Sequence, residues 1–382
     1  MSEEAATVPA VRGLYSPESY GRIGAGADAA AINAAVAAAQ AAGGGVVVLS
    51  QPYAVESTIA VAAGPAVHFW CLGAGNRQVN PDSLTGGYVR PANGFGKNTP
   101  LFSIGKASAP TTNPCGTTFW MPRISGTAPN GTAIKGCTGI LVTDTADVHM
   151  VEPFLVNFDR GGASGTAVRL ASATAGHGVG FCVTGGIISS CWRGIDGDGA
   201  GVTDLRLSGL LEHSNTFGIT LGATAGGGGL QMSGCHLVYA AAPAGSHRLS
   251  LGAVAGDFVI TGNYFDKNGQ SPAVVLATAR GKISDNHFLA DTACTGPVVT
   301  VAAASQALTF RGNDCRANGS PMTALLQLLA GAGGAPSNGV YDGNNVYGPH
   351  PALIAPLIDK SAVAIPPTST ATTYVAGNVV GS

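Results

Sequence analysis

The chain has 382 residues, of which 45% are hydrophobic, only 10% are charged and 57 are glycines, and its formal net charge is −2. This composition excludes an intrinsically disordered chain, because such chains combine high net charge with few apolar residues. It argues against a nucleic-acid-binding surface, because 19 basic residues against 21 acidic ones leave no positive excess for phosphates. It also excludes collagen, because the glycines have no period of three.

Residues 1–24 are predicted to form an N-terminal arm. The chain begins Met-Ser-Glu-Glu, without the apolar core of a secretory signal. Residues 29–55 carry no charge, but they are mostly Ala and Gly and include Asn33, Gln40 and Pro52, which makes a poor membrane-spanning segment. We therefore expect a soluble protein with no signal peptide and no membrane insertion.

The next segment is predicted to be a helix followed by a strand. Asp28 is a candidate N-cap, Ile32 and Val36 share one helix face, and the glycines at 43–45 end the helix. Residues 46–49 then form the strand. Such a helix would cover the open end of a solenoid, which otherwise exposes backbone and core.

Residues 77–135 are rich in Pro, Gly, Asn and Thr and break the pattern that follows. We interpret them as a loop excursion within one β-helix domain over residues 25–350. Residues 351–382 are predicted to be a C-terminal cap or subunit contact.

From residue 146 onward a short pattern recurs, in which alternating apolar residues precede Ser or Thr, Gly or Asp, often Asn, and a second apolar pair. Residues 260–265 (ITGNYF) and 283–288 (ISDNHF) are two copies, and residues 151–155 are an early degenerate one. The Gly or Asp of each copy lies at positions 185, 209, 234, 262, 285, 312, 343 and 377, so the spacing ranges from 23 (262 to 285) to 34 (343 to 377).

This irregular spacing excludes helical repeats of fixed length and fits coils of three short strands with corner loops of variable length. The Gly-Asn steps supply the corners, and stacked Asn side chains can hydrogen-bond from coil to coil. The sequence therefore predicts an all-β protein, a right-handed parallel β-helix (single-stranded solenoid) with an N-terminal capping helix. Its coils would stack at about 4.8 Å.

The front segment resembles the pectate-lyase-like right-handed parallel β-helix superfamily, in the form common in phage tailspikes and polysaccharide-degrading enzymes. The matching residues are Gly26, Asp28, Ala31, Ile32, Ala35, Val36, Ala39, Gly43, Gly44, Gly45, Val47, Tyr53, Ser57, Thr58 and Ile59. Two features depart from the family pattern: alanines replace the acidic pair and Thr before the helix, and the Pro-Gly-Tyr turn reads Ser50-Gln51-Pro52-Tyr53.

The resemblance implies a poly- or oligosaccharide partner and a homotrimer. It also implies a place in a virion tail or on an extracellular surface, or in the cytoplasm if the protein is bacterial. Members include lyases, hydrolases, transferases, epimerases and non-catalytic binding spikes, so the resemblance leaves the activity open.

The register predicts an exposed ladder of side chains. If Phe265 points inward, its column-mates Leu237, Phe288, Cys315 and Val346 do so too, and the residues on either side point outward. The outward set contains His213, His236, Tyr264, Asp266, His287, Asp314 and Arg316. We expect the acids to be candidate catalytic groups and the others to bind substrate, the alternative being a solvated sheet face.

Glu212 falls in the inward column, where burial would raise its pKa and suit it to act as a general acid. A local register shift that leaves it at the surface is the alternative.

A second acidic cluster contains Asp196 and Asp198, close to Trp192, which is a candidate sugar contact. Two carboxylates near a groove are what glycoside hydrolysis requires. The same Asp-Gly-Asp-Gly run also fits a turn or a loose calcium loop.

The eight cysteines are scattered, without a CxxC pair or zinc-ligand spacing, and are expected to be reduced core residues. No cofactor or metal motif is found. Three functions remain: a tailspike-like protein that binds and cleaves a bacterial surface polysaccharide, as a glycosidase or lyase; a non-catalytic receptor-binding or structural spike; and a bacterial glycan lyase or transferase.

Overall fold

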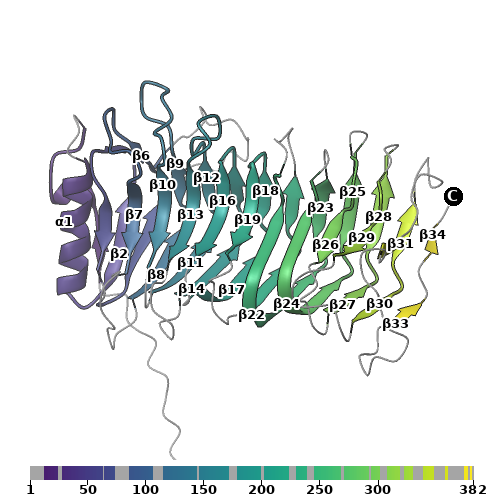
Figure 1. The fold of residues 1–382 in the computed structure, drawn as a ribbon. Coiled ribbons are helices and arrows are strands. Elements are labelled where there is room, and N and C mark those ends of the chain that lie inside the picture. The colour runs from purple at the N-terminus through teal and green to yellow at the C-terminus, as the bar shows by residue number, and fades with distance from the viewer. Residues whose placement is uncertain are drawn as a thin grey trace, which may run out of the picture.

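The structure is a computed structural model. It describes residues 13–24, 28–62, 64–73, 86–105, 115–143, 146–171, 179–198, 202–222, 229–238, 245–267, 271–291, 294–301, 308–318, 322–329, 339–347, 358–359, 374–376 and 379–380. Within these ranges the chain forms the expected right-handed parallel β-helix, with one sheet of 12 strands and one of 22 (Figure 1).

The 12-stranded sheet has one strand from each coil. Its members are β3 (Pro52–Val55), β6 (Tyr88–Pro91), β9 (Arg123–Ser125), β12 (Phe154–Val156), β15 (Ile187–Ser189), β18 (Leu211–His213), β21 (His236–Val238), β23 (Tyr264–Lys267), β25 (His287–Ala290), β28 (Asp314–Ala317), β31 (Asn345–Tyr347) and β34 (Val379–Val380).

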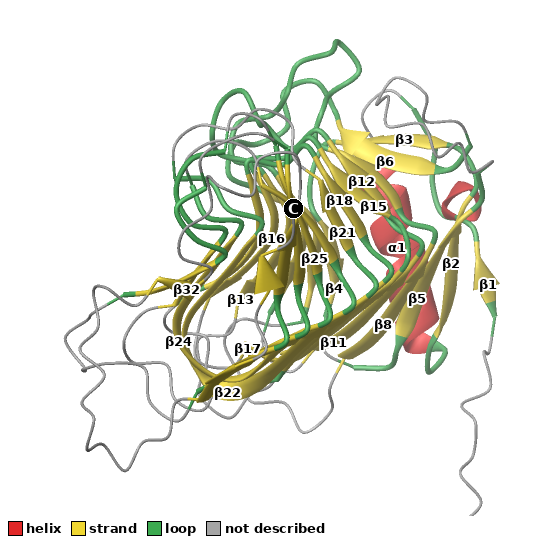
Figure 2. Cartoon of the chain, turned by 90° about the vertical axis from the view of Figure 1, so that its right-hand side faces the viewer, coloured by secondary structure: helices red, strands yellow, loops and turns green. Residues whose placement is uncertain are grey.

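The 22-stranded sheet bends into two rows, which with the 12-stranded sheet make the three sides of the coil (Figure 2). Row 1 comprises β4 (Ile59–Val61), β7 (Pro100–Ile104), β10 (Thr138–Val142), β13 (Thr166–Ala171), β16 (Arg193–Asp198), β19 (Phe217–Leu221), β26 (Val299–Val301), β29 (Leu326–Leu328) and β32 (Ile358–Asp359). Row 2 comprises β1 (Leu14–Tyr15), β2 (Gly45–Leu49), β5 (Val67–Cys71), β8 (Cys115–Trp120), β11 (Ala146–Val151), β14 (Val179–Thr184), β17 (Val202–Ser208), β20 (Leu230–Ser233), β27 (Leu308–Arg311), β30 (Val340–Asp342) and β33 (Tyr374–Ala376). Two long strands, β22 (Leu249–Thr261) and β24 (Val274–Ser284), run through both rows.

The helix α1 (Asp28–Ala41) covers the N-terminal end of the solenoid, as predicted (Figure 1). Ile32 and Val36 are buried against the first coil, and the helix ends before Gly43, whose φ is 87°. Asp28 is the first helical residue and not the expected N-cap. Its carboxylate instead accepts hydrogen bonds from the amides of Gly24 and Ala54, which ties the helix to β3. A 3-10 helix, η1 (Pro17–Ser19), precedes α1.

The corners before the strands from β15 to β31 of the 12-stranded sheet follow the predicted column. Residues 185, 209, 234, 262, 285, 312 and 343 have φ between 58° and 67°, the left-handed region in which glycine is favoured. Asp285 is the one of these that is not glycine, and position 377 lies outside the described residues.

The asparagine that follows this corner forms the predicted ladder. In each step, Oδ1 of one Asn accepts both the backbone N–H and a side-chain N–H of the Asn in the coil before, at 3.0–3.1 Å. The four residues are Asn263, Asn286, Asn313 and Asn344, and each is at most 2% exposed. The inward column next to them is also confirmed, because Leu237, Phe265, Phe288, Cys315 and Val346 are all 0% exposed.

Residues 77–135 differ from the expected loop excursion. Their described parts contain β6, β7, β8 and β9, which continue both sheets without interruption. The strands are three to six residues long and lie between Pro-, Gly- and Thr-rich connections, so the apolar alternation is too short to be recognised. Most of residues 351–382 lie outside the described part, including the expected cap and subunit contact.

No helix among the described residues is long and apolar enough to cross a membrane. The seven cysteines whose side chains are described are free thiols, and all but Cys182 are buried.

Candidate functional site

The outer surface of the 12-stranded sheet, called the B face below, carries the predicted ladder. From β9 to β31, the parallel register places one residue of each strand in a single outward column. In order along the axis, this column contains Arg123, Phe154, Ile187, Leu211, His236, Tyr264, His287, Asp314 and Asn345. The predicted order of the residues from Leu211 to Asn345 is confirmed.

The rings of this column are in contact. The centroids of His236 and Tyr264 are 4.4 Å apart with the rings nearly perpendicular, and those of Tyr264 and His287 are 5.0 Å apart. The ring centroid of Tyr347, which lies two strands further along the sheet, is 6.3 Å from that of His287. His236 is exposed, and Tyr264 and His287 are half-buried. The column therefore presents an aromatic strip to solvent, about 4.8 Å per coil.

A second outward column runs beside the first and contributes His213, Asp266 and Arg316. Burial raises the pKa of the Tyr264 hydroxyl to about 12, and its hydrogen bond to the Asp266 carboxylate adds to this rise. Burial lowers the pKa of His213, and the positive charge of Arg160 lowers it further. Tyr264 is thus a hydrogen-bond donor at neutral pH and a poor base.

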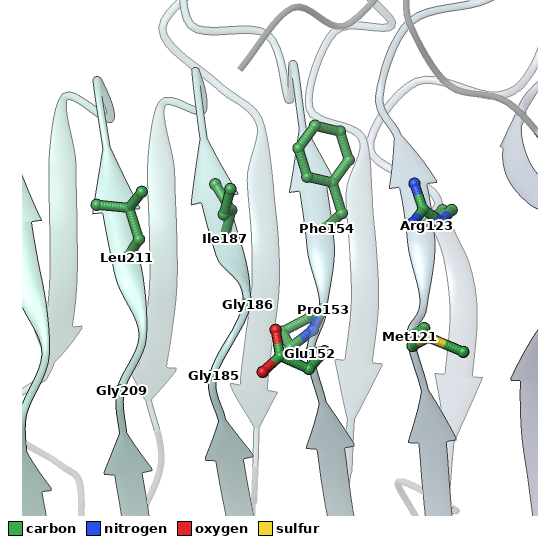
Figure 3. Close-up of a pocket in the computed structure, with 10 residues that line it drawn as sticks. All are labelled: Met121, Arg123, Glu152, Pro153, Phe154, Gly185, Gly186, Ile187, Gly209 and Leu211. Atoms are coloured by element: carbon green, nitrogen blue, oxygen red, sulfur yellow. The ribbon is translucent and has the colours of Figure 1, made fainter. Parts of the chain in front are cut away.

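Towards the N-terminus the same column borders a cavity of about 420 Å³ (Figure 3). Arg123 lies at one end of it, and Phe154, Ile187 and Leu211 form an apolar wall. The cavity floor is the left-handed corner column, where Glu152 (φ 48°) occupies a position that is glycine in the next two coils. The sequence pattern did not single out Arg123 or Glu152, although Glu152 lies within the degenerate copy at 151–155.

Glu212 points inward, as its column predicted, and does not reach the B face. It is 1% exposed, and Nη1 of Arg248 lies 3.2 Å from its Oε2. Burial raises the pKa of the Glu212 carboxyl, and the charge of Arg248 opposes this rise. The expected role of a general acid in the groove is not supported, because the ion pair lies in the core.

Asp196 and Trp192 lie around the corner from the ladder, with Asp196 on row 1. Nη1 of Arg193 is 2.6 Å from Oδ1 of Asp196, and the indole of Trp192 packs edge-on against Phe217 at 5.0 Å. Asp196 and Asp198 belong to strand β16 and not to a turn or calcium loop, and the side chain of Asp198 lies outside the described residues. The structure therefore separates this cluster from the predicted ladder.

Row 2 carries a second, shallower cavity of about 510 Å³ that the sequence did not predict. His68, Asp147, His149 and Arg206 line it. The amide of Thr118 donates to Nδ1 of His68, and burial lowers the pKa of this imidazole. Among the described residues, no three His, Cys, Asp or Glu side chains are placed to hold a metal ion.

No protein-family model matches the chain, and no curated protein matches it in sequence. Among solved structures, the chain is similar to the DFA-IIIase from Arthrobacter chlorophenolicus A6 in complex with GF2, with a TM-score of 0.60, 16% identity, and coverage of 97% of this chain and 92% of that one. The same enzyme without its lid gives a TM-score of 0.62 at 15% identity, with 97% and 94% covered. The likeness is one of fold. A protein of Geobacillus virus E2 (ORF18) is similar at a TM-score of 0.47 and 16% identity, with 88% and 61% covered, which is too low to bear on function.

Proposed function

We propose that the protein binds a poly- or oligosaccharide chain along the B face, parallel to the solenoid axis. The observation that carries this proposal is the unbroken strip of ring contacts from His236 through Tyr264 to His287. Sugars present apolar C–H faces and a rim of hydroxyls, so they are recognised by aromatic surfaces with interspersed donors and acceptors. Asp266, Asp314 and Arg316 supply such polar groups beside the rings.

The sugar ligand GF2 in the DFA-IIIase structure is in keeping with this proposal, but belongs to that protein. The support here comes from this chain's own geometry. The strip is solvent-accessible, repeats at the pitch of the coils, and opens at one end into the cavity beside Glu152. A linear ligand can thus contact several coils at once.

Cleavage of the bound glycan is a second candidate function, favoured by the acids on the same face. The columns of Asp266 and Asp314 are adjacent, and their strands β23 and β28 are two steps apart, roughly 10 Å along the axis. This is nearer the wide carboxylate separation used for inversion than the ~5 Å used for retention. A lyase would instead use an imidazole of the ladder as the base and Arg316 to neutralise a uronate.

The test is to incubate the purified chain with bacterial capsular polysaccharides and lipopolysaccharides and to measure both retention and chain length. Affinity electrophoresis reports binding, size-exclusion chromatography reports shortening, and absorbance of an unsaturated uronate separates lyase from hydrolase. We expect binding that is lost in His236→Ala/Tyr264→Ala. If this double variant still binds every glycan that the wild type binds, the proposal is refuted. Binding without shortening would leave a non-catalytic receptor-binding protein.

We also propose the assembly that the family resemblance implies, a homotrimer displayed on a virion tail or extracellular surface. Light scattering should then give three times the chain mass of 37.8 kDa. A monomer would refute the trimer and leave the glycan proposal standing.

A further inference from the structure

Two arginines lie diagonally on neighbouring strands near the N-terminal end of the B face. Arg123 on β9 is directly opposite Tyr88 of β6, and Arg90 is two residues further along β6, opposite Ser125. Their strand neighbours Val89 and Ile124 point into the core, so both arginines point outward on the same face.

Both guanidinium groups are poorly compensated. Arg123 is 6% exposed, and the Nε atoms of Arg123 and Arg90 are buried without a hydrogen-bond partner in the described part of the chain. The described residues provide no ion pair to either side chain, and Arg90 is held only by the ring of Tyr88, 5.4 Å from its guanidinium carbon. Burying a cation without a counter-charge costs several kcal/mol.

The acids described at this end of the solenoid are used elsewhere. The Asp28 carboxylate accepts from the amides of Gly24 and Ala54, and Glu56 accepts from the amide of Ala29. Glu152 shares the cavity with Arg123, but Figure 3 shows its carboxylate turned towards Gly185, away from Arg123. Among the described residues, the side of the cavity at Arg123 therefore has donors and no anion.

We propose that this end of the B face binds the carboxylate of an acidic sugar residue. The inference rests on the proposed function and specifies its ligand: a glycan that contains uronic acids. The planar Arg123 fork can donate two parallel hydrogen bonds to a carboxylate, and Arg90 adds a second positive charge. The Glu152 carboxylate accepts hydrogen bonds from hydroxyl groups of the same or the next sugar. The apolar wall of Phe154, Ile187 and Leu211 packs against the sugar ring.

The test compares trigalacturonate with its methyl ester, which keeps the sugar and removes the charge, by calorimetry on the full chain. We expect the acid to bind at least tenfold more tightly, with an advantage that shrinks as salt is added. In Arg123→Gln this preference should fall to within twofold. Arg169→Gln, which changes an exposed arginine of row 1, should keep it.

Because Arg123 is buried, its variant is first checked for folding by its unfolding transition, and Arg90→Gln serves as a second variant that should also weaken the preference. Equal binding of acid and ester, or no binding of trigalacturonate at millimolar concentration, overturns the inference. Binding of a neutral glycan in the same assay then leaves the proposed function intact. Conversely, if Tyr264→Ala leaves unchanged the affinity for every polysaccharide that the wild type binds, the ladder itself is not the binding surface.

Discussion

The guanidinium of Arg248 and the carboxylate of Glu212 meet inside the solenoid, 3.2 Å apart, although 36 residues separate them in the chain. Nη2 of Arg248 also donates to the carbonyls of Asn215 and Thr216, so the described partners of the cation include one carboxylate and two backbone oxygens. This arrangement links Glu212, in the middle of β18, to the corner that follows this strand.

Glu212→Gln should therefore lower the free energy of unfolding by about 3 kcal/mol, because it leaves a buried guanidinium without its counter-charge. Urea unfolding measures the loss. Glu152→Gln changes an exposed acid of the same type and should shift stability by less than about 0.5 kcal/mol. Equal stability of the wild type and Glu212→Gln would contradict this account of the pair.

Tyr264→Ala should raise the dissociation constant for a bound glycan at least tenfold, equivalent to about 1.4 kcal/mol. The substitution removes the ring that contacts both His236 and His287 and so interrupts the strip. Affinity electrophoresis with increasing polysaccharide in the gel gives the constant. Trp70→Ala, which removes a 39%-exposed ring on row 2, is the control. A loss of similar size in the control would mean that binding is not confined to the B face.

Gly262→Ala should destabilise the fold by about 1–2 kcal/mol, the usual cost of a left-handed conformation for a residue with a Cβ. Gly262 has φ 64° and no atom within 4 Å of an added Cβ, so the cost isolates the backbone conformation. Gly116 on β8 has equal room and no positive φ. Gly116→Ala should be neutral or slightly stabilising. Thermal unfolding of the two variants measures both changes in stability. Equal changes would show that the corner tolerates a side chain.

Acid should destabilise the protein through His247. Burial lowers the pKa of this imidazole from 6.5 to about 4, and Nε2 lies 3.0 Å from Oγ1 of Thr220. The unfolded chain thus takes up the proton at higher pH than the folded one. Stability is complete above pH 6.5 and falls as the pH drops towards 4, by up to about 3 kcal/mol. His247→Gln should flatten this fall in urea titrations. A variant that loses stability as steeply as the wild type would show that other groups carry the effect.

The sequence was sufficient to predict the B face because two regularities coincide there. The corner column fixes one position in each coil, and the period of two in a strand then fixes which neighbours point out. Placing Phe265 inward was enough to give the order from His236 to Asn345.

The residues that were missed do not follow both regularities. Glu152 occupies a corner position that is glycine in most other coils, so the repeat pattern is incomplete in its coil. Arg123 lies in a coil whose short strands are separated by polar connections, so the repeat pattern is not recognisable there. Arg248 comes from a corner segment, and nothing in the spacing shows that it turns inward to meet Glu212. Trp192 and Asp196, by contrast, were predicted as site residues, but the chain turns a corner after β15 and places Asp196 on β16, away from the B face.

The outward column of the 12-stranded sheet changes in chemistry between β9 and β31. Over this stretch it runs from arginine through phenylalanine, isoleucine and leucine to imidazole and phenol rings, and then to aspartate and asparagine. A polymer bound along such a surface has one preferred orientation. Only in that orientation does each of its substituents lie beside a side chain of complementary chemistry. In the proposed glycan complex, the solenoid would therefore be a directional template that repeats once per coil.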